Sequence, residues 1–316
     1  MTNPISFAHL TDIHLALDGE SWGTLGTLAE RLLAEAIAQL NAQPDLDFVL
    51  ITGDVVDEAT PGEIERFNTL IAELKKPWHF VPGNHDGFRA PSHPETLGPE
   101  EAIPQIDPRL TDPPPYPQRA AWSRAVAGGV RLIGLDSRLP GPWNGHLDAE
   151  QVAWLRGELE AHRDALVILA VHHPLHNLIA RNKEPYWSNF ICDNGAEVDS
   201  LLDAYPNIRL VLAGHHHANQ IRRRGNRLHV NTAALTGYPC SYRLIRLTPG
   251  GSSPASGRWH MQIETRSPAD EGTRELAYDL LLSSEVAHRY NPDDPSAWAE
   301  VVAGREEDQV FDGWLG

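Results

Sequence analysis

The stretch Ile5-Ser6-Phe7-Ala8-His9-Leu10-Thr11-Asp12-Ile13-His14 combines the two features on which the fold depends. Its first six residues have the composition of a buried strand, and an Asp-x-His motif follows at once. The same arrangement, in which a short apolar run leads into metal-binding side chains, recurs along the chain. The further stretches are residues 48–54, 78–86, 166–173 and 208–217.

Helix signals lie between these apolar runs. Residues 25–40 carry apolar side chains at helical spacing, Pro61 suits the first turn of a helix that extends to Leu74, and Asp148 can cap a helix that ends near His162. We expect a further helix near residues 197–204 and hairpins at residues 120–135 and 220–231, where glycine-containing turns join two runs. Strands that alternate with helices predict an α/β fold with parallel strands and helices on the faces of the sheet.

The length of 316 residues suits one large domain or two smaller ones. We expect residues 1–267 to form the main domain, interrupted by an irregular excursion at residues 90–118 that includes Pro113-Pro114-Pro115. Residues 268–316 are polar and acidic, and they predict one helix at 276–282 with little periodicity elsewhere. We interpret them as a C-terminal extension or cap, which either covers the chain's own site, builds a dimer or covers a neighbour's cleft.

The charge balance limits the classes of partner. Lys and Arg number 26 and Asp and Glu number 43 among 316 residues, which gives a net charge of −17. A protein that binds a nucleic-acid backbone needs a basic face, so we expect no nucleic acid as partner. No apolar run reaches the roughly 20 residues that cross a bilayer, and residues 1–10 lack a secretory pattern, so we expect a cytoplasmic protein without a membrane partner. Cys192 and Cys240 are interpreted as reduced thiols.

Five short motifs follow the predicted strands, at the carboxyl ends where an open α/β sheet binds its ligands. They are Asp12-Ile13-His14, Gly53-Asp54, Gly83-Asn84-His85-Asp86, His172-His173 and Gly214-His215-His216-His217. Each motif alone is a weak signal, but core packing does not explain all of them in this order. Carboxylate, amide and imidazole ligands without cysteine suit two divalent ions such as iron, manganese, zinc or cobalt. Ions about 3.5–4 Å apart need a bridging carboxylate, and Asp54 is the only Asp of the set that stands alone after a strand and a glycine.

This pattern resembles the calcineurin-like metallophosphoesterase superfamily over roughly residues 5–235. The residues that match the family's metal ligands are Asp12, His14 and His217 for the first ion, Asn84, His172 and His215 for the second, and Asp54 as the bridge. The resemblance implies a four-layer α/β/β/α sandwich with the site at one edge. It also implies hydrolysis of a phosphate ester by a hydroxide that bridges the two metals.

The resemblance extends to groups that contact substrate. His85 matches a histidine that contacts the phosphate or protonates the leaving group, and Asp86 would orient it. The residues expected to contact substrate are Asn84, His85, His216 and Asn194. The segment Cys192-Asp193-Asn194-Gly195 and the form His172-His173-Pro174 resemble the cyclic-nucleotide and glycerophosphodiester phosphodiesterase branch, which implies a homodimer. From the residues alone, Asn194 suits the start of a helix equally well.

The leading prediction is an enzyme that uses two divalent metal ions to hydrolyse a small phosphodiester, such as a cyclic nucleotide or a glycerophosphodiester. A phosphomonoesterase or nucleotidase on the same scaffold is the alternative, because the sequence does not reveal the loops that choose between the two ester classes. The net charge of −17 counts against a nuclease. A non-catalytic binding module would have lost ligands, and none is missing.

Some neighbours of the motifs have a structural interpretation that competes with a functional one. We favour a position in the core or behind the ligands for His9, and positions behind the ligands or facing substrate for His173 and His216. The aromatic residues between the fourth and fifth motifs either cover a nucleobase or pack an irregular loop; they are Tyr186, Trp187 and Phe190.

Overall fold

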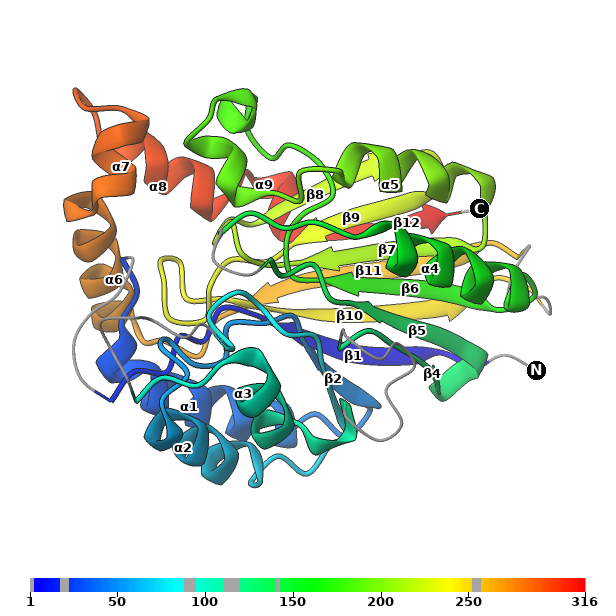
Figure 1. The fold of residues 1–316 in the computed structure, drawn as a ribbon, viewed down its shortest axis with the longest axis horizontal. Helices are drawn as coiled ribbons and strands as arrows, with labels where there is room; N and C mark the ends of the chain where they lie inside the picture. Colours follow the sequence, from blue (N-terminus) through cyan, green and yellow to red (C-terminus); the bar gives the residue numbers. More distant parts are fainter. Residues whose placement is uncertain are drawn as a thin grey trace.

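Two six-stranded sheets form the centre of the molecule in the computed structural model, which describes residues 3–17, 23–87, 95–110, 120–139, 143–251 and 257–315 (Figure 1). The first sheet has the order β12-β11-β10-β1-β2-β3, and the second has the order β4-β5-β6-β7-β9-β8. The strands of the first sheet are β1 (Ile5–Leu10), β2 (Phe48–Ile51), β3 (Trp78–Phe80), β10 (Tyr242–Pro249), β11 (Trp259–Arg266) and β12 (Val310–Leu315). Those of the second are β4 (Trp122–Val126), β5 (Val130–Leu135), β6 (Leu166–Val171), β7 (Ile208–Ala213), β8 (Gln220–Arg224) and β9 (Arg227–Asn231).

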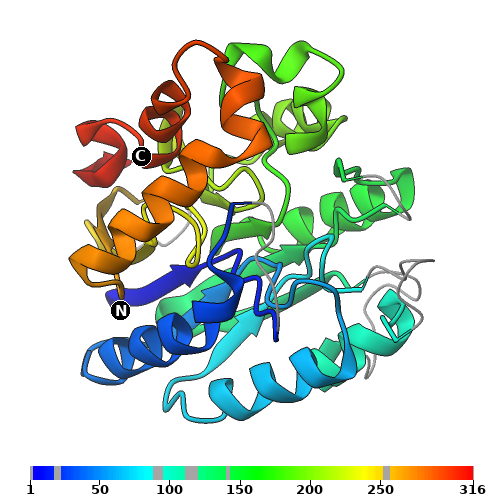
Figure 2. The ribbon, with the colours of Figure 1, turned by 90° about the vertical axis from the view of Figure 1, so that its left-hand side faces the viewer.

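Helices cover the outer faces of the two sheets, so the predicted four-layer α/β/β/α sandwich is confirmed (Figures 1 and 2). The helices on the first sheet are α1 (Ala29–Asn41), α2 (Pro61–Ile71) and α3 (Pro99–Ile106), and those on the second are α4 (Ala149–Ala161) and α5 (Gly195–Leu201). Along β5, Leu132 joins the core between the sheets, whereas Ile133 joins the core beneath α4 and α5. This division follows from the strand geometry, because successive side chains point to opposite faces.

Parallel pairing brings the functional loops together. β1, β2 and β3 are parallel in the first sheet, and β5, β6, β7 and β9 are parallel in the second. Parallel strands place their carboxyl ends at one edge of a sheet. The two edges coincide in this molecule, because Asp54, which follows β2, contacts His172, which follows β6. The hairpins predicted at residues 120–135 and 220–231 are confirmed as β4–β5 and β8–β9.

The prediction of an irregular excursion at residues 90–118 is wrong for the described residues 95–110. They contain α3 and a short 3₁₀ turn at Pro108–Leu110, whereas residues 88–94 and 111–119, including Pro113-Pro114-Pro115, lie outside the described residues. Pro99 occupies the first turn of α3, where a proline costs no hydrogen bond. Ile103 and Ile106 are buried, and this burial outweighs the unfavourable Pro104 inside the helix.

The C-terminal segment is more ordered than its weak periodicity predicts. The single helix expected at residues 276–282 is part of the longer α6 (Glu271–Ser283), and α7 (Glu285–Tyr290), α8 (Ser296–Ala303) and α9 (Glu306–Gln309) follow it. β12 then pairs with β11 as the edge strand of the first sheet. α6, α7 and α8 stand at the sheet edge where β1 ends (left side of Figure 1), and α6 crosses that edge in Figure 2. Within the described residues, no helix combines the length and apolar character needed to span a membrane.

Arg243 on β10 ties the C-terminal segment to both sheets. Its side chain is fully buried. The guanidinium donates hydrogen bonds to the carbonyl of Asp308 (2.6 Å), the carbonyl of Asn231 at the end of β9 (3.2 Å) and Oγ1 of Thr265 on β11 (2.5 Å). Burial lowers the pKa of Arg243 to about 9, which still leaves the group charged at neutral pH. Removal of such a donor leaves buried acceptors without a partner.

Arg243→Ala should lower the free energy of unfolding by about 2–4 kcal/mol, because its buried acceptors lose their donor. Urea unfolding followed by circular dichroism measures the change. Arg246→Ala is the matched control, since Arg246 lies on the same strand and is exposed. The control should shift the free energy of unfolding by less than about 0.5 kcal/mol. Equal shifts in the two variants would contradict the role assigned to Arg243.

Candidate metal centre

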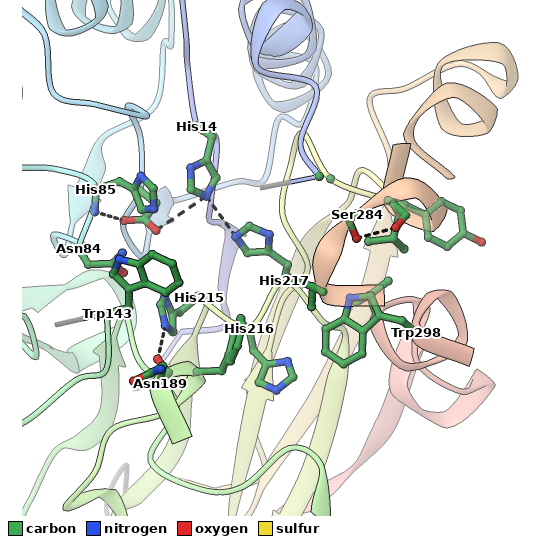
Figure 3. A pocket seen from close by; sticks show the side chains of 18 residues that line it. His14, Asn84, His85, Trp143, Asn189, His215, His216, His217, Ser284 and Trp298 are labelled. Carbon is green, nitrogen blue, oxygen red and sulfur yellow. Dashed lines mark hydrogen bonds and ion pairs between the residues drawn. The ribbon is translucent and has the colours of Figure 1, made fainter. Parts of the chain in front are cut away.

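Loops after five strands carry the predicted metal-binding side chains to the shared edge of the two sheets (Figure 3). Residues of the first sheet's loops are Asp12 and His14 after β1, Asp54 after β2 and Asn84 after β3. Residues of the second sheet's loops are His172 after β6 and His215 and His217 after β7. The structure therefore brings together all the residues that the sequence predicts as metal ligands.

One group consists of Asp12, His14 and His217. The Nε2 atoms of His14 and His217 lie 3.1 Å apart, and Nε2 of His217 lies 3.4 Å from Oδ1 of Asp12. Nε2 of His14 lies 3.9 Å from the same carboxylate oxygen. The three side chains thus turn one donor atom each toward a common point, as ligands of one cation do.

The second group consists of Asn84, His172 and His215, and Asp54 lies between the two groups. Nε2 of His172 lies 3.1 Å from Oδ1 of Asn84, and the ring of His215 lies 4.9 Å from the ring of His172. Oδ2 of Asp54 lies 3.2 Å from Nε2 of His172 and 3.8 Å from Nε2 of His14. Asp54 is therefore placed to serve both groups, as a bridging carboxylate must.

Hydrogen bonds to the protein set the direction of the imidazole rings. Nδ1 of His172 donates to the carbonyl of Thr52 (2.6 Å), which leaves its Nε2 facing Asp54. Nδ1 of His14 lies 3.1 Å from Oδ1 of Asp57. Nε2 of His215 donates to a backbone carbonyl, that of Asn189 (2.9 Å). Histidines that bind metals make this kind of contact with their other nitrogen, because it fixes the tautomer and the ring.

The backbone adopts the left-handed region at the loops that carry these side chains. Its φ angles are 51° at Asp12, 44° at His14, 51° at Asp54, 63° at His215 and 52° at His217. Such conformations cost on the order of 1–3 kcal/mol each and cluster at functional sites. Gly53 has φ 94°, and a Cβ at this position would lie 2.5 Å from Nδ1 of His172. No side chain fits there.

The charges of the site favour cations. Burial alone would raise the pKa of Asp12, but His217 and His172 lower it to about 2. Burial likewise opposes ionisation of Asp54, and His172 and His85 nevertheless hold its pKa well below the usual value. Burial would lower the pKa of His172, but Asp54 and Asp12 raise it to about 9. Buried carboxylates that stabilise neighbouring positive charge, together with imidazole and amide donors, fit a pair of divalent metal ions.

The sequence model of the calcineurin-like phosphoesterase family matches residues 5–219. The chain belongs to this family. Calcineurin-like phosphoesterases use divalent metal ions, in agreement with the donor groups described above, and the chain is accordingly a hydrolase that acts on phosphoesters.

Named relatives of this calcineurin-like phosphoesterase are bacterial phosphodiesterases. A 3′,5′-cyclic-nucleotide phosphodiesterase of Nostoc is 30% identical over 83% of this chain and 92% of the relative. A 3′,5′-cyclic adenosine monophosphate phosphodiesterase of Pseudomonas aeruginosa is 27% identical over 78% of this chain and 83% of the relative. A glycerophosphodiester phosphodiesterase of Enterobacter lignolyticus is 28% identical over 66% of this chain and 70% of the relative.

Solved structures share the fold of the chain. A dimetal phosphatase from Danio rerio superposes with a TM-score of 0.60 at 18% identity and covers 84% of this chain and 97% of its own. A purple acid phosphatase from yellow lupin superposes with a TM-score of 0.55 at 14% identity and covers 85% of this chain and 52% of its own. At these identities the likeness concerns the architecture alone.

His85 of this calcineurin-like phosphoesterase lines the pocket beside the candidate ligands. Its Nδ1 donates to the carbonyl of Asp57 (2.6 Å) and lies 3.6 Å from Oδ1 of the same residue. Burial would lower the pKa of His85, but the carboxylates of Asp54 and Asp57 raise it above its usual value. Asp57, which no motif singles out, is thus the residue that orients His85.

The expectation that Asp86 orients His85 is wrong. The Asp86 carboxylate accepts hydrogen bonds from the backbone N–H groups of Asp54 (2.7 Å), Val55 (2.7 Å) and Gly83 (2.8 Å). These amides lie just beyond the ends of β2 and β3, where no neighbouring strand offers a carbonyl as acceptor. The buried carboxylate of Asp86 accepts their hydrogen bonds instead. Burial and the nearby Asp54 raise the pKa of Asp86 to about 7.

Of the other residues expected to contact substrate, His216 lines the pocket and Asn194 does not. His216 lines the pocket, with its ring 5.6 Å from that of Phe190 and 5.7 Å from that of Trp298. Asn194 braces a loop instead, because its Oδ1 accepts from the N–H of Leu147 (3.1 Å) and its Nδ2 donates to the carbonyl of Leu147 (2.7 Å). The predicted substrate contact of Asn194 is therefore wrong, and its side chain does not cap α5 either.

Two further histidines lie behind the site. His9 is fully buried, with Nε2 2.8 Å from Oγ1 of Thr52 and Nδ1 2.9 Å from Oγ1 of Thr232, which confirms the core position. His173 contacts Oγ of Ser137 through Nδ1 (2.8 Å) and the Trp143 carbonyl through Nε2 (2.8 Å). Both ring nitrogens of His173 have hydrogen-bond partners in the protein, so the ring packs behind the candidate ligands rather than turning a nitrogen toward a metal ion.

Sequence reasoning missed most of the pocket that adjoins the metal-binding groups. Its lining includes Trp143, Asn189 of the 3₁₀ helix Trp187–Phe190, and a set of side chains from the C-terminal half: Tyr238, Leu281, Val286, Trp298 and Val302. Phe190, which also lines the pocket, had a competing interpretation as loop packing. The sequence pattern of an amphipathic helix does not distinguish an apolar residue that lines a pocket from one that packs in the core. The sequence of residues 268–316 therefore does not reveal that these helices line the pocket.

Asp54→Ala should lower the bound metal from about two ions per chain to one or none, because both groups lose the carboxylate that they share. Elemental analysis by mass spectrometry after manganese loading and desalting measures the content. Asp312→Ala is the control, because that carboxylate is 59% exposed on β12 and should leave the metal content unchanged. Two ions per chain in Asp54→Ala would rule out the bridging position.

Proposed function

We propose that this chain hydrolyses a small phosphodiester, namely a 3′,5′-cyclic nucleotide or a glycerophosphodiester. The observation that carries the proposal is the position of Asp54, whose Oδ2 lies within 3.8 Å of a ring nitrogen in each ligand group. A site in which two groups share one carboxylate suits in-line displacement at phosphorus. The relatives from Nostoc, Pseudomonas aeruginosa and Enterobacter lignolyticus, which are named as phosphodiesterases, support the diester class.

Two divalent ions would complete the site, with manganese and iron as first candidates and zinc or cobalt as alternatives for the same donors. The residues that would hold the first ion are Asp12, His14 and His217, those for the second are Asn84, His172 and His215, and Asp54 would serve both. When bound, the ions supply Lewis acidity and a nucleophile at neutral pH.

The chain's own polar groups would act on the ester around this site. The Asn84 side chain, which lines the pocket with Oδ1 toward His172, can turn its amide N–H toward a phosphoryl oxygen. His85 would pass a proton from Nε2 to the leaving oxygen, because its Nδ1 is held by the Asp57 carbonyl on the other side of the ring. Asp57 thereby acts as the positioning residue of His85.

Other properties of the protein are proposed with the activity. We propose a small-molecule phosphate ester as substrate, a cytoplasmic location, no nucleic-acid or membrane partner, and a homodimer. Residues 268–316 would act as a cap on the domain formed by residues 1–267. A phosphomonoesterase or nucleotidase would use the same ligands, so the choice of ester class is the decisive measurement.

Protein loaded with manganese should hydrolyse bis(4-nitrophenyl) phosphate with a kcat/KM about ten-fold or more above that for 4-nitrophenyl phosphate. Asn84→Ala should lower the diester value by about 10²-fold or more, because a metal-site donor and a phosphate contact are lost together. Release of 4-nitrophenolate measures both. Asn226→Ala, at the exposed turn between β8 and β9, is the control and should retain activity. A preference for the monoester would establish the phosphatase alternative.

His85→Ala should lower kcat/KM for a diester with an alkyl leaving group by about 10²–10⁴-fold, because an alkoxide needs a proton as it departs. The loss for a 4-nitrophenyl diester should be smaller than about ten-fold, since 4-nitrophenolate leaves without a proton. Product formation from both esters is compared by chromatography. His260→Ala, at a histidine on β11 whose side chain is 26% exposed, controls for the loss of an imidazole elsewhere. Equal losses on both esters would exclude the proton-donor role.

A further inference from the structure

The pocket beside the metal-binding groups has a side that takes no part in the proposed chemistry. Figure 3 shows Ser284 and Trp298 opposite Asn84 and His85, with His217 between them. The side chains on this side form what we call the apolar wall: Tyr238, Leu281, Val286, Trp298 and Val302. The pocket contains about 740 Å³ of space, part of it open to solvent.

Aromatic packing holds Trp298 of the apolar wall in place, and the neighbouring hydroxyl of Ser284 is bonded within the protein. The ring of Trp298 lies 5.2 Å from that of Trp187 and 5.0 Å from that of Tyr290. Oγ of Ser284, on the same side of the pocket, donates to the carbonyl of Leu281 (2.6 Å) and accepts from the N–H of Ala287 (3.2 Å), because Ser284 caps α7. This hydroxyl is therefore used within the protein, and the wall presents apolar and aromatic surface.

We propose that the apolar wall binds the nucleobase of the substrate, so that this chain selects a 3′,5′-cyclic nucleotide over a glycerophosphodiester; the inference rests on the phosphodiesterase function proposed above. A base has a flat π-face that gains from contact with aromatic and aliphatic side chains. A glycerol arm carries hydroxyl groups, which gain less than a flat base does from contact with side chains such as Leu281, Val302 and Trp298. The phosphate of such a nucleotide would lie at Asn84 and His85 while the base reaches toward α6 and α8.

Phe190 and His216 join the two parts of the pocket. The ring of Phe190 lies 6.1 Å from that of His215, a candidate ligand, and 5.6 Å from that of His216. The ring of His216 lies in turn 5.7 Å from that of Trp298. Contiguous rings thus lead from the second ligand group to the apolar wall, which is the direction that a planar substituent on the ester would follow.

The test compares two substrates with the same scissile group. 3′,5′-Cyclic AMP carries a base, and methyl riboside 3′,5′-cyclic phosphate has a methoxy group in its place. Manganese-loaded wild-type protein should hydrolyse the first with a kcat/KM about ten-fold or more above that of the second. Phosphorus NMR follows both reactions. Equal values for the two substrates would overturn the inference, since the base would then contribute nothing.

Variants on α6 and α7 test whether the preference for the base-bearing substrate depends on the apolar wall. Leu281→Asn places an amide in the apolar wall and should reduce the preference for the base-bearing substrate by about five-fold, through a higher KM, with little change for the methyl riboside. Leu276→Asn makes the same change on the same helix at a side chain that is 49% exposed and outside the pocket, and it should leave the preference intact. Val286→Asn on α7 repeats the test if Leu281→Asn fails to fold.

The outcomes separate this inference from the proposed function. Equal losses on both substrates in Leu281→Asn and Val286→Asn would overturn the base-binding role while leaving the phosphodiesterase intact. Hydrolysis of glycerophosphodiesters without hydrolysis of either cyclic phosphate would also overturn the base-binding role and leave the phosphodiesterase function intact. Metal-loaded protein that hydrolyses no diester, including bis(4-nitrophenyl) phosphate, would overturn the proposed function itself and this inference with it.

Discussion

The Asp86 carboxylate is the constraint on which the rest of the site depends. It accepts hydrogen bonds from backbone amides at Asp54, Val55 and Gly83, and so ties the loop after β2 to the loop after β3. Those amides point into a fully buried region where water does not replace a missing acceptor. Once the loops are joined, the N–H of His85 can donate to Oδ1 of Asp54 (2.8 Å), which leaves Oδ2 directed at the histidines. A single buried acceptor therefore aims the carboxylate that serves both ligand groups.

The histidine contacts then fix how the two sheets lie against each other. His172 follows β6 in the second sheet, yet its Nδ1 donates to the carbonyl of Thr52 at the end of β2 in the first. The N–H of His215, after β7, donates to the Asp12 carboxylate after β1 (2.9 Å). These bonds cross from one sheet to the other at the edge where the left-handed loop residues store strain. The core between the sheets supplies the apolar burial that offsets this strain.

Much of the fold and of the ligand set follows from sequence because both obey one rule: parallel strands end at a common edge. The positions of Asp12 and Asp54 after two strands of one sheet predict that they lie together, whereas His172, which follows a strand of the other sheet, was placed with them by the family resemblance. Asp86 was misjudged because its partners are backbone amides, which no side-chain motif displays. Asn194 was misjudged for a similar reason, since its amide is consumed by the backbone of Leu147. The apolar residues of α6–α8 could not be identified as pocket because their spacing is that of any buried helix face.

The two sides of the pocket come from different parts of the chain. Under the proposed function, the side that holds Asn84 and His85 must keep the geometry of a metal site, so its residues would have few alternatives. The helices of the apolar wall have further contacts away from the candidate ligands: Arg31 on α1 donates to Oγ1 of Thr273 on α6 (2.6 Å), and β12 pairs with β11 beyond α9. The wall also meets the loop after β7, because the N–H of Asn219 donates to the carbonyl of Val302 (2.9 Å) and the ring of His216 lies 5.7 Å from that of Trp298. Under the proposed function, the strand ends would act on phosphorus, and Tyr238 together with the helices that follow β11 would select the ester arm.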